Sequence, residues 1–289
     1  MDSDFQSRTI SLRRPLDLRL TLAPTRLGKG DPCTKLRGDE AFRASRTPDG
    51  PVTLHLRVRG ARLGARAWGP GADWALEQLP ELVGEFDRGV VRTDHRLILE
   101  LQERLTGLRI GATRRMLEAM LPAIAAQGTT NFEAKRTYRQ VIEKLGDPAP
   151  GPRALDLFVP PAARDLAAAS FQELHLLGLE QGRADVMRRA AARAAALESA
   201  TALPAGQVES QIRRVAGVGV WTAAVVRHVV LGDPDVVPVG DRRLADLVAW
   251  VFTGNRHGSD AQMLDLLEPF RGQRGRVIRL LRAARLGPS

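Results

Sequence analysis

The sequence predicts an α+β fold, with a small antiparallel sheet domain in residues 1–92 and a helical domain in residues 93–289. Two changes in side-chain pattern support this division. Apolar and polar side chains alternate over residues 52–58, which is the period of a half-buried strand. From about residue 93 onward, apolar side chains recur every three or four residues, which is the period of a helix. A chain of 289 residues is long enough for two such domains.

The N-terminal third contains two alternating segments of the kind expected of strands. Leucines at positions 16, 18, 20 and 22 alternate with polar residues, as do the apolar residues of the run 52–58. The turn sequence Pro48-Asp49-Gly50-Pro51 stands directly before the second run. We therefore expect an antiparallel sheet with one solvated face. After the sheet, Asp73 is expected to cap a short helix that carries Trp74, Leu76 and Leu79.

The rest of the chain is expected to be helical, with one rigid interruption. Thr113 is a candidate cap for a helix over residues 116–124, which Pro122 should kink or divide. Residues 147–152 contain three prolines and form a stiff connector. Further helices are expected to begin near residue 98 and to cover residues 132–145, 163–176, 183–197, 207–214, 221–231, 244–252, 263–267 and 277–286.

Residues 207–231 form the most informative pattern, a helical hairpin with two glycines at its turn. Val208 and Ile212 have helical spacing, and the sequence Val-Ala-Gly-Val-Gly-Val-Trp-Thr-Ala of residues 215–223 leads into the next helix. Gly217 and Gly219 let the chain reverse without a Cβ atom in the way. Free N–H groups at a helix start, at the positive end of its dipole, form a seat for phosphate. The carboxylate of Asp241, in the loop that follows, is placed to act on whatever the phosphates carry.

The glycine turn, the loop sequence Asp-Val-Val-Pro-Val-Gly-Asp of residues 235–241 and the spacing between them resemble the helix-hairpin-helix (HhH-GPD) DNA glycosylases. The resemblance is closest to the bacterial 3-methyladenine DNA glycosylases of the AlkA type. Upstream, residues 107–110, 123–127, 133–134 and 146–147 follow that family's order, so the similarity covers residues 105–285 well. It implies a small sheet domain packed on a two-lobed, all-α glycosylase body, with the hairpin at about residues 207–231.

The resemblance implies a catalytic carboxylate and a base pocket. Asp241 matches the aspartate that stabilises the positive charge of the sugar in the transition state or activates water. Trp221 matches a tryptophan that stacks on the flipped base, and Gln127 and Arg242 fall at other pocket positions. The plainer interpretations remain open at this point, with Asp241 as a helix cap and Trp221 as a core side chain.

The same comparison predicts a monofunctional enzyme. Members that also cut the DNA strand have a Schiff-base lysine at the position of Trp221, and tryptophan cannot form that bond. The protein is therefore expected to excise alkylated, 3-methyladenine-like purines by hydrolysis and to leave an abasic site in double-stranded DNA. No cofactor is required for this chemistry.

The resemblance also implies how the hairpin binds DNA. Backbone N–H groups of Gly217 and Gly219, with the Thr222 hydroxyl, are expected to contact a phosphate. In relatives, backbone carbonyls of this hairpin hold a monovalent cation that bridges to the phosphate. The matching carbonyls for a Na⁺ or K⁺ ion belong to Arg213, Val215 and Val218.

Two positions depart from the family pattern. AlkA-type enzymes fill the space left by the flipped base with a leucine wedge, where this chain has Gly128. The neighbouring Thr129 or Thr130 is the candidate substitute. Arg242 replaces an aromatic pocket residue, and a different range of damaged bases is one consequence. On the last helix, arginines at 276, 279 and 282 form a stripe that faces either DNA or solvent.

The composition fits a DNA-binding protein of a reducing compartment. The net charge is +10 and the sequence pI about 11.0, which favours a polyanionic partner, although 39 arginines against four lysines also suit a biased codon supply. Cys33 is the only cysteine, which excludes a four-cysteine iron–sulfur cluster within the chain. No signal peptide or membrane span is recognisable. We expect a monomer in the bacterial cytoplasm, associated with the nucleoid through DNA.

Two other functions fit the same residues. The first is a DNA-binding protein of the same fold that recognises lesions without cutting the glycosidic bond or acts on a narrow set of substrates. Gly128 and Arg242 keep it open, whereas Asp241 favours the enzyme. The second is a protein-interaction module built on a helical hairpin, against which the phosphate-binding glycines argue.

Overall fold

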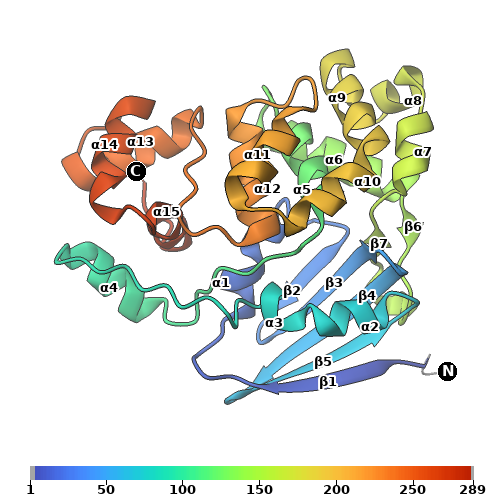
Figure 1. The fold of residues 1–289 in the computed structure, drawn as a ribbon, viewed down its shortest axis with the longest axis horizontal. Coiled ribbons are helices and arrows are strands. Elements are labelled where there is room, and N and C mark those ends of the chain that lie inside the picture. The colour runs from blue at the N-terminus through green and yellow to red at the C-terminus, as the bar shows by residue number, and fades with distance from the viewer. Residues whose placement is uncertain (1–3, 288–289) are drawn as a thin grey trace.

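The computed structural model describes residues 4–287 and shows a sheet below a body of helices (Figure 1). The sheet is antiparallel, with the strand order β1-β5-β4-β3-β2. Its strands are β1 (Gln6–Ser11), β2 (Thr34–Arg37), β3 (Glu40–Thr47), β4 (Gly50–Arg59) and β5 (Arg62–Trp68). The predicted α+β fold class is therefore confirmed.

The strand expected from the alternation in residues 52–58 is β4. Its turn is also as expected, because Thr47 pairs with Gly50 and leaves Pro48 and Asp49 as a two-residue loop. Gly50 has φ +126°, which favours glycine. Val52, Leu54 and Leu56 point to the same face and pack with helices α2 (Ala72–Glu77) and α3 (Leu79–Leu82) in one hydrophobic core. Burial of this alternating face fixes the register of the strand.

The strand expected from the leucines at positions 16–22 is wrong, because residues Leu18–Leu22 form a helix, α1. The carboxylate of Asp17 accepts a hydrogen bond from the backbone N–H of Leu20, which caps the helix. Leu18 and Leu22 belong to the core that the sheet forms with α2 and α3, whereas Leu20 packs against the C-terminal helices. Since both sides of this helix are covered by apolar neighbours, its leucines do not show the pattern of a helix with one wet face.

Two predicted helix caps are also wrong. Helix α2 starts after Gly71, and Asp73 lies in its first turn without capping it. Helix α5 (Met116–Ala125) is not capped by Thr113. Instead, the Glu198 carboxylate accepts hydrogen bonds of 3.0 Å from the N–H groups of Met116 and Leu117. A carboxylate at this end of a helix is favoured by the helix dipole, and this one comes from 82 residues away.

The helices form two lobes, each with its own hydrophobic core (Figure 1). The first lobe contains α5, α6 (Asn131–Leu145), α7 (Ala163–Ala168), α8 (Phe171–Leu176), α9 (Gln181–Ala192), α10 (Ala194–Ser199), α11 (Ala205–Arg213) and α12 (Val220–Leu231). The second contains α4 (Arg96–Arg104), α13 (Arg242–Thr253), α14 (Asp260–Leu267) and α15 (Arg274–Ala283).

Three helices differ from expectation in their continuity, and α14 and α15 each begin three residues earlier than expected. Pro122 does not end α5, which continues to Ala125. The helix expected over residues 163–176 is divided, because Ser170 and Glu173 form a capping box that starts α8. The helix expected over residues 183–197 is divided at Arg193. The connector at residues 147–152 begins with the short strand β6 (Asp147–Pro148), which pairs with β7 (Phe158–Val159).

None of the helices within residues 4–287 combines the length and the hydropathy that a membrane crossing requires.

Candidate active site

The turn between α11 and α12 has the geometry of an exposed glycine hairpin. The Val218 N–H donates to the Val215 carbonyl at 2.9 Å and closes the turn, and Gly217 has φ +92°. A Cβ atom at Gly217 would overlap the side chain of Val186 on α9, whereas one at Gly219 would meet no atom within 4 Å. Gly217 therefore serves the packing of the turn, and Gly219 leaves the start of α12 open to a ligand.

Two long side chains fasten this hairpin to the rest of the first lobe. The side-chain amide of Gln127, at the end of α5, donates to the Gly217 carbonyl at 3.2 Å and to the Thr222 hydroxyl at 2.9 Å. The Arg189 guanidinium on α9 donates to the Ala216 carbonyl at 3.1 Å. Thr222 is buried, so its hydroxyl faces the hairpin interior and not the exposed turn. Gln127 braces the hairpin in this structure.

The loop from α5 to α6 contains the wedge positions. Gly128 is exposed with φ +59°, and a Cβ atom there would meet nothing within 4 Å. Thr130 caps α6 in a capping box with Glu133, and the Thr129 hydroxyl donates to the same carboxylate at 2.6 Å. Hydrogen bonding to both threonines, first Thr129, lowers the pKa of the Glu133 carboxyl. Both hydroxyls are thus engaged within the loop.

Asp241 is the N-cap of α13, and each of its carboxylate oxygens has a partner. Oδ1 accepts a hydrogen bond of 3.1 Å from the Leu244 N–H, and Oδ2 accepts one of 2.7 Å from the Arg282 guanidinium on α15. The Asp241 side chain is 20% exposed and that of Arg282 is 47% exposed. The carboxylate is therefore fixed in position but open to solvent. Capping a helix and serving a reaction are compatible roles here, because the cap uses only Oδ1.

The loop before Asp241 lies against the start of α12, at Trp221. A Cβ atom on Gly240 would be 3.7 Å from the Cβ atom of Trp221. The Gly240 N–H donates to both carboxylate oxygens of Asp260, at 3.1 Å each, which ties the loop to the start of α14. Trp221 is partly buried, and Arg242 is exposed on the first turn of α13.

The arginine stripe of α15 differs from both interpretations offered by the sequence. Arg276 is buried and pairs with Asp87, and Arg279 donates to the Leu20 carbonyl of α1 and contacts the His228 ring. Only Arg282 reaches the candidate site. Burial, together with the neighbouring charges of Arg282 and Arg276, lowers the pKa of Arg279 to about 9. Arg276 and Arg279 thus connect α15 of the second lobe to Asp87 and to α1.

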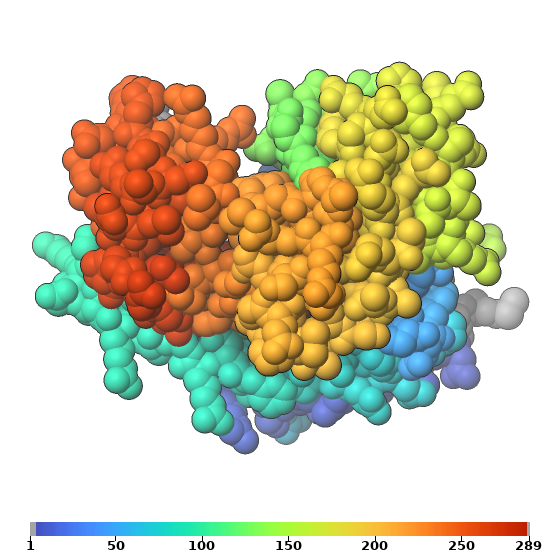
Figure 2. All heavy atoms as spheres, turned by 45° about the horizontal axis from the view of Figure 1, so that its top comes forward, coloured from blue at the N-terminus to red at the C-terminus, as the bar shows by residue number. Residues whose placement is uncertain are grey.

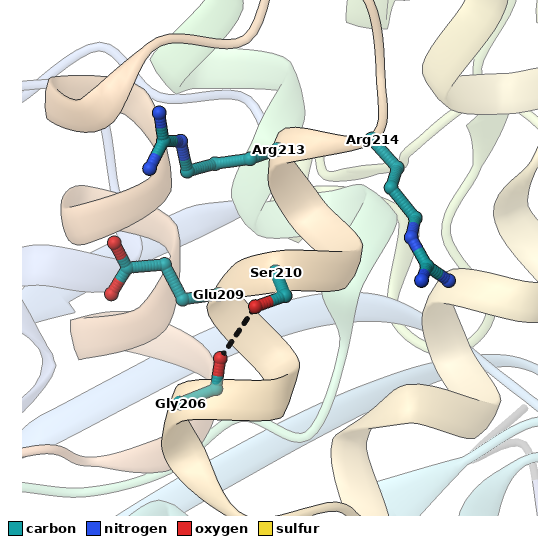
Figure 3. Close-up of a pocket in the computed structure, with 5 residues that line it drawn as sticks. All are labelled: Gly206, Glu209, Ser210, Arg213 and Arg214. Carbon is teal, nitrogen blue, oxygen red and sulfur yellow. Dashed lines mark hydrogen bonds between the residues drawn. The ribbon is translucent and has the colours of Figure 1, made fainter.

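Two surface cavities lie elsewhere. One, of about 360 Å³, is lined by residues of α11 and by Arg214 directly after it, and the side chains of Arg213 and Arg214 extend to opposite sides (Figure 3). The other, of about 470 Å³, is lined by residues before α4 together with the end of α12. Figure 2 shows a notch between the C-terminal helices, in orange-red, and the green segment that holds the α5–α6 loop.

Side chains suited to a metal ion do not gather in the described part of the chain, where no group of three His, Cys, Asp or Glu is close enough to hold one. The candidate cation site at the hairpin would use backbone carbonyls only. Of these, the Val215 carbonyl already accepts the N–H of Val218 within the turn.

Sequence reasoning did not find Arg189, Asp260 or the pairing of Arg282 with Asp241. Arg282 was visible as part of a stripe, but its partner is 41 residues away. The proximity of Asp260 to the aspartate loop had no local signal, because 20 residues separate it from Gly240.

Comparison with known proteins shows similarity in fold at low sequence identity. No protein-family model matches the chain, and no curated protein matches it. A solved 3-methyladenine DNA glycosylase from Archaeoglobus fulgidus has a TM-score of 0.79 at 17% identity, over 96% of this chain and 99% of that one. An 8-oxoguanine glycosylase/lyase from Clostridium acetobutylicum, in its apo form, has a TM-score of 0.69 at 13% identity, over 97% and 99%. Its complex with double-stranded DNA containing 8-oxoguanine opposite cytosine gives 0.68 at 12%, over 99% and 100%.

The chain therefore shares the fold of these two solved proteins over nearly its whole length. Since one of these proteins is named as a glycosylase and the other as a glycosylase/lyase, the fold accommodates both activities.

Proposed function

We propose that the protein is a monofunctional DNA glycosylase, which hydrolyses the N-glycosidic bond of alkylated, 3-methyladenine-like purines in double-stranded DNA. The observation that carries this proposal is the placement of Asp241. Its carboxylate is held at the N-cap of α13, directly after Gly240, whose Cβ position is 3.7 Å from the Cβ atom of Trp221 at the start of α12. A phosphate seat, an aromatic face and a carboxylate are the groups that base excision needs.

In this proposal the hairpin binds the DNA backbone and the notch between the lobes receives a flipped nucleotide. Extrusion of a base from the duplex costs a few kcal/mol, which contacts in the pocket must offset. Trp221 offers a face for stacking on the base. The free N–H groups at the start of α12, after Gly219, bind a phosphate. A Na⁺ or K⁺ ion held by the carbonyls of Arg213, Val215 and Val218 would add a bridge to the same phosphate.

The proposed role of Asp241 is electrostatic. As the bond to the base breaks, the deoxyribose gains oxocarbenium character, which a fixed carboxylate stabilises, and the same group can accept a proton from the attacking water. Oδ1 is held by the Leu244 N–H, so Oδ2 is the oxygen available to the sugar. Because Arg282 occupies Oδ2 in the structure, the guanidinium has to share or yield this oxygen when the nucleotide enters.

The absence of lyase activity belongs to the proposal as well. The Schiff-base reaction requires an amine at the sugar. The four lysines of the chain are at positions 29, 35, 135 and 144, and none is in the hairpin or in the aspartate loop. One DNA site is formed by one chain, so a monomer suffices. A protein of this function acts at the nucleoid of a bacterial cytoplasm.

The test measures base release from alkylated duplex DNA by the parent protein and by Asp241→Asn. We expect release by the parent and a loss of at least roughly 100-fold in the variant, as for removal of a key electrostatic group. Asp265→Asn on α14 is the matched control, because this aspartate is exposed. Equal release by the parent and Asp241→Asn would refute the assignment of Asp241.

A second candidate is a lesion-binding protein that does not cut the bond. The ion pair between Asp241 and Arg282 favours it, because it neutralises the carboxylate, and Gly128 removes the usual wedge. This function predicts tight, salt-sensitive binding to damaged duplex without base release.

A further inference from the structure

Asp260 lies at the start of α14, and its carboxylate holds the loop that carries Asp241. Both carboxylate oxygens accept a hydrogen bond from the Gly240 N–H, at 3.1 Å each. Gly240 directly precedes Asp241, so this contact fixes the peptide next to the candidate catalytic side chain. It joins two segments that are 20 residues apart, which means that tertiary packing places it and not the turn itself.

Helix α14 does not need the Asp260 side chain for its own capping. Ser259 is the N-cap, and its hydroxyl accepts a hydrogen bond of 3.1 Å from the Gln262 N–H. Asp260 is the first residue of the helix, where the helix dipole favours a negative charge. Its carboxylate is directed at Gly240, outside the helix. Removal of this side chain should therefore leave α14 in place.

A second aspartate fixes the other end of the loop. The Asp235 carboxylate accepts hydrogen bonds from the N–H groups of Gly272 and Arg274, at 2.7 Å and 3.1 Å, and from the Arg274 guanidinium at 2.9 Å. These partners lie at the start of α15 or just before it. Residues 235–240 thus run between two contacts with the second lobe, one at each end.

The direction of the Asp241 side chain depends on the backbone on both sides of its Cα atom. On the C-terminal side the backbone is part of α13, because the Asp241 carbonyl accepts the N–H groups of Leu244 and Ala245 at 2.9 Å and 3.0 Å. On the N-terminal side the Asp241 N–H is 3.4 Å from the Pro238 carbonyl, which is a long hydrogen bond. The contacts of the Gly240 N–H with Asp260 are shorter and restrain the backbone at this side.

We propose that Asp260 is a positioning residue for the reaction of Asp241 and that it acts through its hydrogen bond to the Gly240 N–H. This role rests on the proposed glycosylase function, since it concerns the alignment of the Asp241 carboxylate with the deoxyribose. A displacement of about 1 Å in a reacting group can slow a reaction by about 100-fold. Binding of the DNA backbone depends instead on the hairpin between α11 and α12. Loss of the Asp260 carboxylate should therefore slow bond cleavage without weakening DNA binding.

The experiment measures the single-turnover rate of base release from alkylated duplex DNA, together with the affinity for a duplex that contains a tetrahydrofuran abasic analogue. Asp260→Ala is expected to lower the rate about tenfold and to leave the affinity within about twofold of the parent. Asp260→Asn keeps an oxygen that accepts the Gly240 N–H, so its rate should stay within about threefold of the parent. Asp265→Ala is the matched control, because Asp265 is an exposed aspartate of the same helix, and it should behave like the parent in both measurements.

A double-mutant cycle shows whether Asp260 acts through Asp241. In the Asp241→Asn background, Asp260→Ala should change the remaining rate by less than about twofold, because residues that act as a unit have non-additive effects. A general loss of structure would lower the rate by the same factor in both backgrounds. That result would overturn the positioning role, as would a rate for Asp260→Asn as low as that of Asp260→Ala.

Amide hydrogen exchange at Gly240 reports the hydrogen bond without any reaction. Exchange should be about tenfold faster in Asp260→Ala than in the parent or in Asp260→Asn, because the N–H loses its acceptor. Thermal unfolding of Asp260→Ala should stay close to that of the parent, since Ser259 still caps α14. Equal exchange in the parent and in Asp260→Ala would contradict the proposed contact.

The outcomes separate this role from the proposed function. If the parent releases methylated bases and Asp260→Ala releases them at the same rate, the positioning role is overturned and the glycosylase stands. If the parent releases no base although exchange at Gly240 depends on Asp260, the glycosylase falls, and the role of Asp260 in the reaction falls with it.

Discussion

Arg282 and Asp241 form an ion pair that joins the last turn of α15 to the N-cap of α13, with 2.7 Å between the guanidinium nitrogen and Oδ2. The pair occupies the carboxylate oxygen that the proposed reaction needs. It also fixes the side chain in the position from which it would act. Occupation of Oδ2 should slow the proposed reaction, whereas fixing the side chain should favour it. Substitution of Arg282 shows which of the two effects is larger.

Arg282→Ala is expected to raise the single-turnover rate of base release, by up to about fivefold. The reason is that an unpaired carboxylate stabilises a developing cation better than a neutralised one, and a solvent-exposed pair of this kind is worth about 1 kcal/mol or less. Arg282→Lys should stay close to the parent rate, since it keeps the charge. A rate for Arg282→Ala as low as that of Asp241→Asn would show that the arginine is needed to position the carboxylate.

Gly217→Ala is expected to lower the stability of the protein, whereas Gly219→Ala is expected to lower its affinity for DNA. At Gly217, with φ +92° and Val186 in contact, a methyl group should lower the free energy of unfolding by about 1–3 kcal/mol. At Gly219, whose φ is −87° and whose Cβ position is open, stability should change by less than about 0.5 kcal/mol. DNA affinity of Gly219→Ala should nevertheless fall about fivefold or more, because the methyl group stands where a phosphate approaches the helix start. Thermal unfolding and titration with duplex DNA check both, and unchanged DNA affinity in Gly219→Ala would argue against the phosphate seat.

Borohydride trapping with abasic duplex DNA should leave no covalent adduct with the parent protein. A Schiff base requires an amine at the sugar, and position 221 carries a tryptophan. Trp221→Lys is the positive control, since its side chain starts beside the Gly240–Asp241 loop and should yield a trapped complex. An adduct with the parent would contradict the monofunctional assignment.

Stability is expected to decrease as the pH falls from 6.5 to about 4, because of His228. Burial, and then the charge of Arg279, lower the pKa of His228 to about 4 from its ordinary 6.5. Since Arg279 can only donate, His228 Nε2 accepts and Nδ1–H donates to the Asp233 carbonyl at 2.9 Å, which requires the neutral ring. The unfolded state binds the proton first, so the stability present above pH 6.5 is lost as the pH falls through this range.

The contribution of His228 should be about 1–3 kcal/mol between these two pH values. Thermal unfolding at pH 7, 5.5 and 4.5 measures it, with His228→Gln as the comparison. The variant should be less stable than the parent at pH 7 and should show a smaller decrease toward pH 4.5. Parallel pH profiles of the two proteins would exclude His228 as the cause.

Local patterns predicted local structure well. The hairpin followed from Gly217, Gly219 and the helical spacing on either side, because the constraints on a tight turn lie within the turn itself. Strand β4 followed from its alternation, which burial of one face imposes. The capping box of Thr130 and Glu133 was not predicted, although all its atoms lie within one helical turn.

Relationships between distant segments could not be predicted in this way. Glu198 caps α5 from a helix 82 residues away, so the sequence around α5 offered only Thr113 as a cap. Residues 16–22 showed a strand-like alternation because helix α1 is covered on two sides, a condition set by tertiary packing. The Arg282–Asp241 pair depends in the same way on how the second lobe folds.

Helix α1 packs on both the sheet domain and the helical body, so the two parts are structurally dependent on each other. Leu18 and Leu22 belong to the core of the sheet domain, and Leu20 packs on the second helical lobe. The Leu20 carbonyl also accepts a hydrogen bond from Arg279. A truncation that began after residue 22 would leave this guanidinium without its acceptor and uncover apolar surface on the second lobe. Arg279 and Arg282 both belong to α15, so the contact of the N-terminal segment with this helix also helps to hold Arg282 against Asp241.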